Sequence, residues 1–245
     1  MSQSKPMVES IVHSVMGVKE TAPSIKSLNN SQEIDGKAIL TYLLGTLTQI
    51  ALMVFALWAT SQAYNRLLIY NIPDWSYTAI ASLFLIFLTI RSRLFSPLDN
   101  TRNAGTYKEV IRPNWAPPPL AFPIIWMTIG VLRMVSSLLV WQATGENFLA
   151  FPLIIYVIHL ALGDTWNTIF TVQRRFGSAV PVVIFGPWLS AIIVTVIYGQ
   201  TTTLAGFLLL PSVIWITVAC VLVYSIWQLN GREPFYPTKR EAIES

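Results

Sequence analysis

Long apolar runs separated by short polar loops dominate the chain from residue 38 onward. Each run is long enough, or nearly so, for a membrane-spanning helix of about 20 residues. The last uncharged stretch, Phe176 to Gly231, is too long for one helix, so the polar segment from Tyr198 to Thr203 is interpreted as a turn. The pattern therefore predicts six spans, at residues 38–61, 75–92, 117–142, 148–171, 178–198 and 204–229.

Both ends of the chain are polar. Residues 1–36 mix acidic and basic side chains and lack the apolar core of a signal peptide. Apolar residues recur there at helical spacing from Met7 to Met16, which fits either a short helix on the membrane surface or a disordered tail. Residues 231–245 form a polar C-terminal tail.

The positions of the basic residues predict the topology. With six spans, all but two of the 16 Lys and Arg residues fall in the two tails, the second loop or the fourth loop. The exceptions are Arg66, in the first loop, and Arg133, inside a span. Because positively charged loops stay on the cytoplasmic side, both termini and the second loop are expected to face the cytoplasm.

Composition fixes the class of protein. Hydrophobic residues make up 53% of the chain and charged residues only 11%, against about 25% charged residues in soluble domains. The single cysteine, Cys220, excludes a disulfide within the chain and a cysteine-based metal site. The sequence shows no nucleotide-binding loop, nucleic-acid motif, paired carboxylates or nucleophile with its base. We therefore expect an integral membrane protein that binds no nucleic acid and has no evident catalytic set.

The segment "RPNWAPPPLAFPIIW", from Arg112 to Trp126, combines rigid prolines with large indoles at the start of the third span. Proline is tolerated in the first turn of a helix, so Pro117–Pro119 are predicted to mark where this span begins. Trp115 suits the aromatic belt at the membrane surface. Pro123 could open a gap between helices, beside which Trp126 would form a flat wall. The alternative is an ordinary helix entry with belt aromatics.

Three ordered blocks between about Ser76 and Asn230 resemble the translocator protein family, also known as TspO/MBR, peripheral benzodiazepine receptors or tryptophan-rich sensory proteins. The first is "YKEVIRPNWAPP" from Tyr107, followed by Trp126. The second is "HLALGDTW" followed by "RRFG", and the third is "LAGFLLLPSVIWITVA" followed by "WQLN". Their order and spacing agree with the family across some 150 residues.

The resemblance implies an all-α, TspO-like bundle of five transmembrane helices, which is usually dimeric. Here it would occupy residues 76–230, preceded by one extra transmembrane helix and its loop at residues 37–75. Family ligands are flat and hydrophobic: porphyrins and haem, and in animal members cholesterol and synthetic drugs. They bind in a pocket under the long first loop, which corresponds to residues 92–117.

The resemblance also implies roles for individual residues. Trp126 and Trp215 match the pocket tryptophans, and Ala219 lies one turn beyond Trp215, where its small side chain leaves room for ligand. For Trp166, as for Trp141 and Trp227, helix packing is the favoured alternative. The expected ligand-binding residues are Trp115, Pro117, Pro118, Phe122, Trp126, Asp164, Trp166, Pro211, Trp215 and Ala219.

The chain also departs from the family pattern. Gly130 stands where the family has a tyrosine, and Gly163 and Val223 stand where asparagines are common. The fourth-loop pattern is replaced at residues 178–182. The cholesterol-recognition pattern is incomplete after Tyr224, so sterol binding has no support.

Two charges inside the predicted spans, Arg133 and Asp164, have no counterpart in that pattern. Charged residues in a span usually face the bundle interior or a water-filled site. Arg133 could reach the membrane surface, pair with Asp164 or bind a porphyrin propionate. His159 could be a partner of Arg133 or a haem ligand, although a lone histidine is more often a satisfied core residue.

The sequence thus favours a membrane receptor or carrier for tetrapyrroles or other flat hydrophobic ligands, with no required cofactor but with porphyrin or haem as bound ligand. Light-dependent porphyrin breakdown is one alternative, and assembly through the extra helix is another. Expected partners are the ligand, the lipid bilayer and a second copy of the chain. The expected location is a bacterial inner membrane or a plastid-type membrane.

Overall fold

The computed structural model of the 245-residue chain describes residues 18–19, 28–70, 73–98, 102–103 and 110–242. The region of the predicted surface helix, Met7 to Met16, lies outside these residues, as does the start of the first family motif at Tyr107. Within the described part, six helices are long and apolar enough to cross a membrane. The number of spans predicted from the sequence is therefore confirmed.

Several of these spans consist of more than one helical segment. The first is α2 (Gly36–Leu67) with the 3₁₀ turn η2 (Leu68–Tyr70), and the second is α3 (Asp74–Arg91) with η3 (Ser92–Phe95). The third is α5 (Ala121–Ala143), and the fourth is α6 (Phe151–Asn167) with the π-helical turn η4 (Thr168–Val172). The fifth joins α7 (Phe176–Val183), the π-helical turn η5 (Ile184–Trp188) and α8 (Leu189–Thr201), and the sixth is α9 (Thr203–Leu229).

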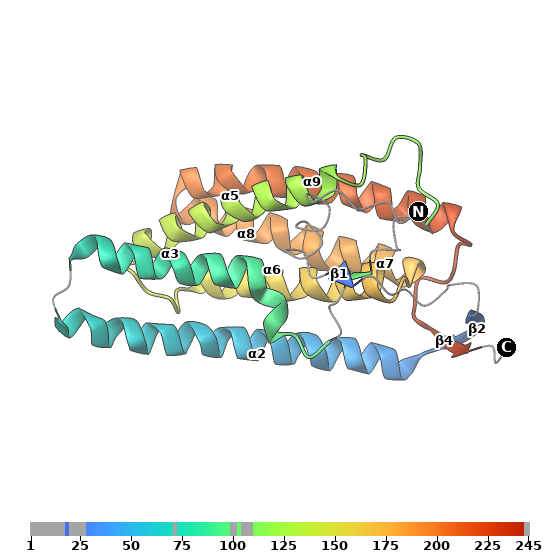
Figure 1. Ribbon diagram of the computed structural model, residues 1–245, viewed down its shortest axis with the longest axis horizontal. Helices are drawn as coiled ribbons and strands as arrows, with labels where there is room; N and C mark the ends of the chain where they lie inside the picture. Colours follow the sequence, from blue (N-terminus) through green and yellow to red (C-terminus); the bar gives the residue numbers. More distant parts are fainter. Residues whose placement is uncertain (1–17, 20–27, 71–72, 99–101, 104–109, 243–245) are drawn as a thin grey trace, which may run out of the picture.

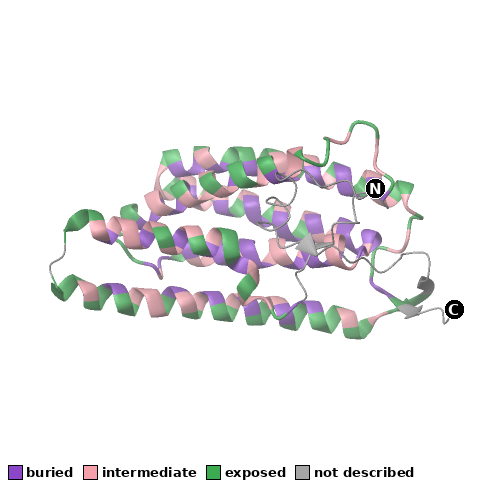
Figure 2. Cartoon of the chain, viewed as in Figure 1, coloured by how far each residue is buried: buried purple, intermediate pink, exposed green. Residues whose placement is uncertain are grey.

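Five of the spans pack side by side around a common interior, in an order that differs from their order along the chain. α3 packs on α5, α5 on α9, α9 on α8, and α8 on α6. The extra helix α2 packs on α6 and on η3, along one edge of the bundle (Figure 1). Apart from a stripe of buried positions, α2 carries exposed and half-buried residues along its length (Figure 2). The five-helix unit thus carries its additional helix on the outside.

The third span begins later than predicted. Residues 117–120 form a turn, in which the Ala121 N–H donates to the Pro118 carbonyl at 2.9 Å, and α5 starts at Ala121. The reason is steric, because a residue that precedes a proline is disfavoured in helical conformation. Pro117 and Pro118 are each followed by a proline. Pro123 is only the third residue of α5, so it removes no hydrogen bond within the helix. Any gap beside Pro123 would therefore not come from a lost hydrogen bond of α5, and the predicted gap stays a prediction.

The turn between the last two spans lies where the sequence places it. α8 ends at Thr201 and α9 begins at Thr203, with extended backbone at Thr202 (φ −153°, ψ 127°). The Thr202 N–H donates to the Tyr198 carbonyl at 2.8 Å. A single residue therefore suffices to reverse the chain.

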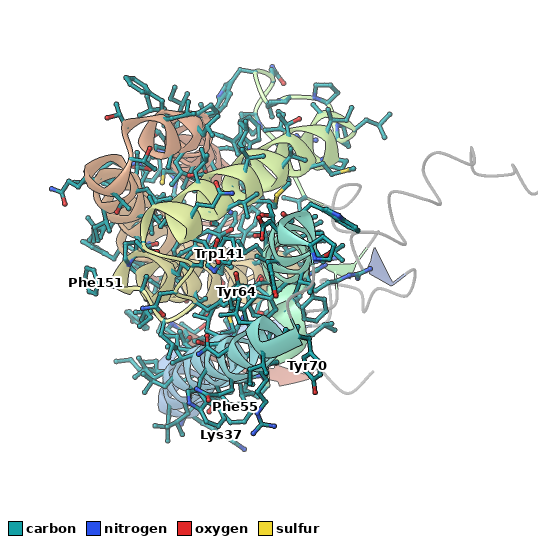
Figure 3. The ribbon with its side chains drawn as sticks, turned by 90° about the vertical axis from the view of Figure 1, so that its left-hand side faces the viewer. Lys37, Phe55, Tyr64, Tyr70, Trp141 and Phe151 are labelled. Atoms are coloured by element: carbon teal, nitrogen blue, oxygen red, sulfur yellow. The ribbon has the colours of Figure 1, made fainter. Side chains whose placement is uncertain are left out.

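The extra helix is anchored at one end by an aromatic cluster. The Tyr64 ring of α2 meets the Trp141 ring of α5 edge to face, with 5.6 Å between ring centroids and an interplanar angle of 87°. Tyr64 makes similar contacts with Tyr77 and Phe148, and its hydroxyl donates to Glu146. Tyr64 and Trp141 lie inside the bundle in Figure 3, whereas Phe55 of the same helix points outward. α2 is thus part of the hydrophobic core.

Two short sheets join segments that the sequence analysis treats as polar tails or loop. β2 (Leu28–Ile34) pairs antiparallel with β4 (Thr238–Ala242), and β1 (Val18–Lys19) pairs parallel with β3 (Arg102–Asn103). β2 and β4 meet at the end of the bundle where α2 begins (Figure 1). The described segments just before the first span and just after the last therefore lie together, as six spans require, while the side of the membrane on which they lie stays a prediction.

Helices α8 and α9 approach closely at a pair of glycines. A methyl group at Gly206 would lie 2.6 Å from the Gly199 Cα and 3.2 Å from the Thr195 carbonyl oxygen. Both contacts are with backbone, which cannot rotate away. By contrast, a methyl group at Gly130 on α5 would meet nothing within 4 Å.

We predict that Gly206→Ala lowers the melting temperature of the purified protein in detergent, because α8 and α9 must separate. The cost should be about 1–3 kcal/mol, as for overpacked cores. Gly130→Ala is the matched control and should leave stability unchanged or raise it, since alanine favours helix. Equal melting temperatures for the two variants would contradict the close approach.

Asp35 joins the start of α2 to the loop after η4. Its carboxylate accepts the Ala38 N–H at 2.9 Å, as a helix N-cap, and pairs with the Arg175 guanidinium at 2.8 Å. The hydrogen bond from Ala38, and then Arg175, lower the pKa of Asp35 below its ordinary value, against the opposing effect of burial. A lowered pKa means that the ionised form is favoured in the folded state. The contribution of Asp35 to stability is therefore present above the pKa that its side chain has in the unfolded chain. It is lost as pH falls through the lower pKa of the folded protein.

We predict that Asp35→Ala lowers stability by about 0.5–2 kcal/mol at neutral pH, the usual cost of losing an N-cap. The difference from wild type should hold above the ordinary pKa of an aspartate, about 4, and shrink as pH falls below it toward the lowered pKa of the folded state. Melting curves from pH 3 to 8 test this. Glu33→Ala is the control, because the exposed pair of Glu33 and Lys239 should contribute little. A difference that grows on acidification would refute the assignment.

Candidate functional site

A cavity of about 450 Å³ lies inside the ring of five helices. Its walls come from α3, α5, α6, α7 and α9, from the 3₁₀ turn η3, from both π-helical turns and from the described end of the second loop. π-helical turns often occur at functional sites, because they shift side chains out of the regular helical register. Here η4 contributes Phe170 and Thr171 to the wall, and η5 contributes Pro187.

Aromatic side chains form much of the cavity wall. Trp126 enters from α5, Trp215 from α9 and Trp166 from α6. The Trp166 and Phe170 rings stack with 5.5 Å between centroids and an interplanar angle of 7°, and the Phe122 ring meets Trp215 edge to face at 5.7 Å. The cavity thus presents flat apolar surfaces from three helices.

The structure brings together six of the ten predicted site residues and leaves four outside. Those that line the cavity are Phe122, Trp126, Asp164, Trp166, Trp215 and Ala219. Those that do not are Trp115, Pro117, Pro118 and Pro211. Trp115 is 51% exposed, and Pro211 is exposed on α9. The proline motif contacts a residue of the wall, because the Pro117 carbonyl accepts a hydrogen bond of 2.6 Å from Arg112, which does line the cavity.

Charged residues at the wall are mostly basic. Arg93, Arg112 and Arg133 line the cavity, and Asp164 is the one acidic side chain among the described lining residues. Arg112 also lies over the Phe122 ring, 5.1 Å from its centroid. An apolar cavity with this balance of charge favours a hydrophobic ligand that carries negative charge.

The Asp164 carboxylate accepts hydrogen bonds from the extra helix α2 and from η3. Its Oδ2 accepts hydrogen bonds from Gln49 Nε2 of α2 at 2.8 Å and from Ser92 Oγ at 2.6 Å. Gln49 is fully buried and also donates to the Ser92 carbonyl at 3.1 Å. One turn earlier, Thr46 bonds Thr165 at 2.6 Å. α2 therefore positions the acidic group of the cavity, a role that the sequence analysis did not assign to it.

Arg133 does not form the ion pair with Asp164 that was one of the sequence hypotheses. Its Nε and Nη2 donate to Ser212 Oγ at 3.0 and 2.7 Å. The guanidinium also lies over the Trp126 ring, 5.9 Å from the centroid. Nearby, His159 is buried, and its Nδ1 is 2.8 Å from Ser190 Oγ. Its role as a haem ligand stays a prediction.

Two glycines that depart from the family pattern lie at the cavity wall. Gly130 and Gly163 both line it, and a methyl group at either would meet nothing within 4 Å. The room that a tyrosine and an asparagine would take is therefore part of the cavity in this chain.

Residues 79–228 match the sequence model of the TspO/MBR family. The chain belongs to the TspO/MBR family. With its six apolar helices, it is a multi-pass membrane protein with a TspO-like fold. The match begins within α3, so α2 lies outside it.

Relatives of this TspO/MBR protein occur in bacteria and mammals. Protein CrtK of Rhodobacter capsulatus is 33% identical over 143 residues, which cover 58% of this chain and 85% of the relative. The tryptophan-rich sensory protein of Cereibacter sphaeroides is 31% identical over 129 residues, 52% of this chain and 78% of the relative. The human translocator protein is 30% identical over 126 residues, 51% of this chain and 74% of the relative.

We predict that Gln49→Glu destabilises the protein strongly. The substitution keeps the shape of the side chain but places a second carboxylate beside Asp164, and two like charges in a buried site repel each other. The loss should be about 3–5 kcal/mol, the cost of an uncompensated buried charge. Melting temperature in detergent is the measurement.

The same substitution at Gln142, which is exposed near the end of α5, serves as the control and should change little. Equal stability of the two variants would show that Gln49 and Asp164 do not meet.

Proposed function

We propose that this TspO/MBR protein is a membrane receptor or carrier for flat hydrophobic ligands, with tetrapyrroles such as porphyrin or haem as the principal class. The observation that supports this most directly is the cavity of about 450 Å³ whose walls include Trp126, Trp166 and Trp215. Planar apolar rings stack favourably on indole faces. The volume lies within the usual range of about 300–1,000 Å³ for small-molecule sites.

The names of the relatives support a role in sensing or transport. One is a tryptophan-rich sensory protein and another is a translocator protein. We propose that porphyrin or haem is a ligand here and not a resident cofactor. The bacterial relatives favour a bacterial inner membrane over a plastid-type membrane. Pairing with a second copy stays a prediction.

Light-dependent porphyrin breakdown is a second candidate, because three indoles would lie close to a bound pigment. Assembly through the extra helix receives less support. α2 uses its buried stripe to pack on α6 and to hold Asp164, and the remaining apolar face is of the kind that lipid covers.

We predict that protoporphyrin IX and haem quench the tryptophan fluorescence of the purified protein saturably. Trp126→Phe and Trp215→Phe should each weaken binding about two- to tenfold, the value of a lost aromatic contact. Trp58→Phe is the control, because Trp58 is 46% exposed on α2 and does not line the cavity. Binding that does not saturate in wild type, or that weakens no more at Trp126 and Trp215 than at Trp58, would refute the proposal.

A further inference from the structure

Arg133 occupies an unusual position for a charged residue. It lies 12 residues after the start of α5 at Ala121, about 18 Å along a helix of 1.5 Å per residue. That places it near the middle of a membrane span. A charge at such depth is costly unless it is paired or faces a polar site, and it therefore usually marks a functional position.

The groups in direct contact with this guanidinium are neutral. It donates to one hydroxyl, Ser212 Oγ, and lies over one ring, Trp126. Among the described residues, no carboxylate oxygen lies within 4.0 Å of it. Arginine has five N–H donors, and the described hydrogen bonds use only Nε and Nη2. The charge and several donors are left for something within the cavity, which Arg133 lines.

The acidic group of the cavity is committed elsewhere. Asp164 receives hydrogen bonds from Gln49 and Ser92, and it attracts Arg93 of η3 electrostatically. These partners lie on α2 and at the end of α3, whereas Arg133 is turned toward Ser212 on α9. Asp164 also attracts Arg133 electrostatically, but it forms no hydrogen bond or close ion pair with it, so N–H donors of the guanidinium stay available to a ligand in the cavity.

We propose that Arg133 is an anion subsite that binds a carboxylate of the ligand, so that the ligand enters with an acidic group deepest. Guanidinium and carboxylate match in a two-pronged, charge-assisted hydrogen bond. The Trp126 ring centroid lies 5.9 Å from the Arg133 Cζ, so a flat ring packed beside Trp126 brings its carboxylate toward Arg133. The class of ligand is therefore a planar hydrophobic acid. This inference rests on the proposed use of the cavity, but it does not require the ligand to be a tetrapyrrole.

The test compares acids with their uncharged esters. One pair is protoporphyrin IX and its dimethyl ester, and the other is 1-pyrenebutanoic acid and its methyl ester. Wild type should bind each acid about ten- to a hundredfold more tightly than its ester, as for a hydrogen bond to a charged group. Arg133→Gln should remove this preference while binding the esters as wild type does, which shows that the cavity is intact.

Arg66→Gln is the matched control, because Arg66 is exposed near the end of α2, away from the cavity, and should keep the preference. Arg133→Lys keeps the charge without the planar fork and should retain part of the preference for acids over esters. An acid preference that survives in Arg133→Gln would overturn the proposal. Equal binding of acid and ester by wild type in both pairs, or failure of both acids to saturate, would also overturn it.

The two pairs separate this inference from the proposed function. If the pyrene acid binds through Arg133 while porphyrins fail to saturate, the anion subsite is supported and the tetrapyrrole ligand is refuted. Displacement of bound pyrene acid by oleate as readily as by protoporphyrin IX would assign the subsite to lipid acids and would overturn the assignment to planar ones.

Discussion

The hydrogen bonds that Asp164 accepts from Gln49 and Ser92 connect the extra helix, the second span and the cavity wall in one place. A carboxylate inside a membrane protein needs donors within the protein, because lipid offers none. Gln49 supplies one of these donors from outside the five-helix unit. The added helix therefore takes part in the electrostatics of the cavity, besides packing against the bundle.

The cavity exists because the helices around it are irregular where they meet it. The π-helical turns η4 and η5 interrupt two spans at the wall, and glycines stand where larger side chains would fill the space. Elsewhere the bundle is tightly packed, as at Gly199 and Gly206 between α8 and α9. The close approach of these glycines and the aromatic cluster around Tyr64 lie at the same end of the bundle, where α2, α5 and α8 finish, whereas the cavity extends to the start of α5.

A feature of the structure can be predicted from the sequence when the residues that cause it lie close together along the chain. Six spans follow from charge-free runs, because the cost of charge in lipid acts on every residue of a segment. Trp126, Trp215 and Ala219 are found at the cavity because their motifs are local. Gln49 is a polar residue in an apolar run and could have drawn attention, but its partner lies 115 residues away, which no local pattern specifies. The strands β2 and β4 pair in the same long-range way and are likewise missed.

The position of α2 has a consequence for how copies of this protein can associate. It covers a face of α6 that relatives lacking such a helix would leave to lipid or to a partner. In this chain that face is occupied by a segment of the same polypeptide, whose high effective concentration favours it over a second molecule. With α2 in this place, a second copy of the chain cannot pack on the same face of α6.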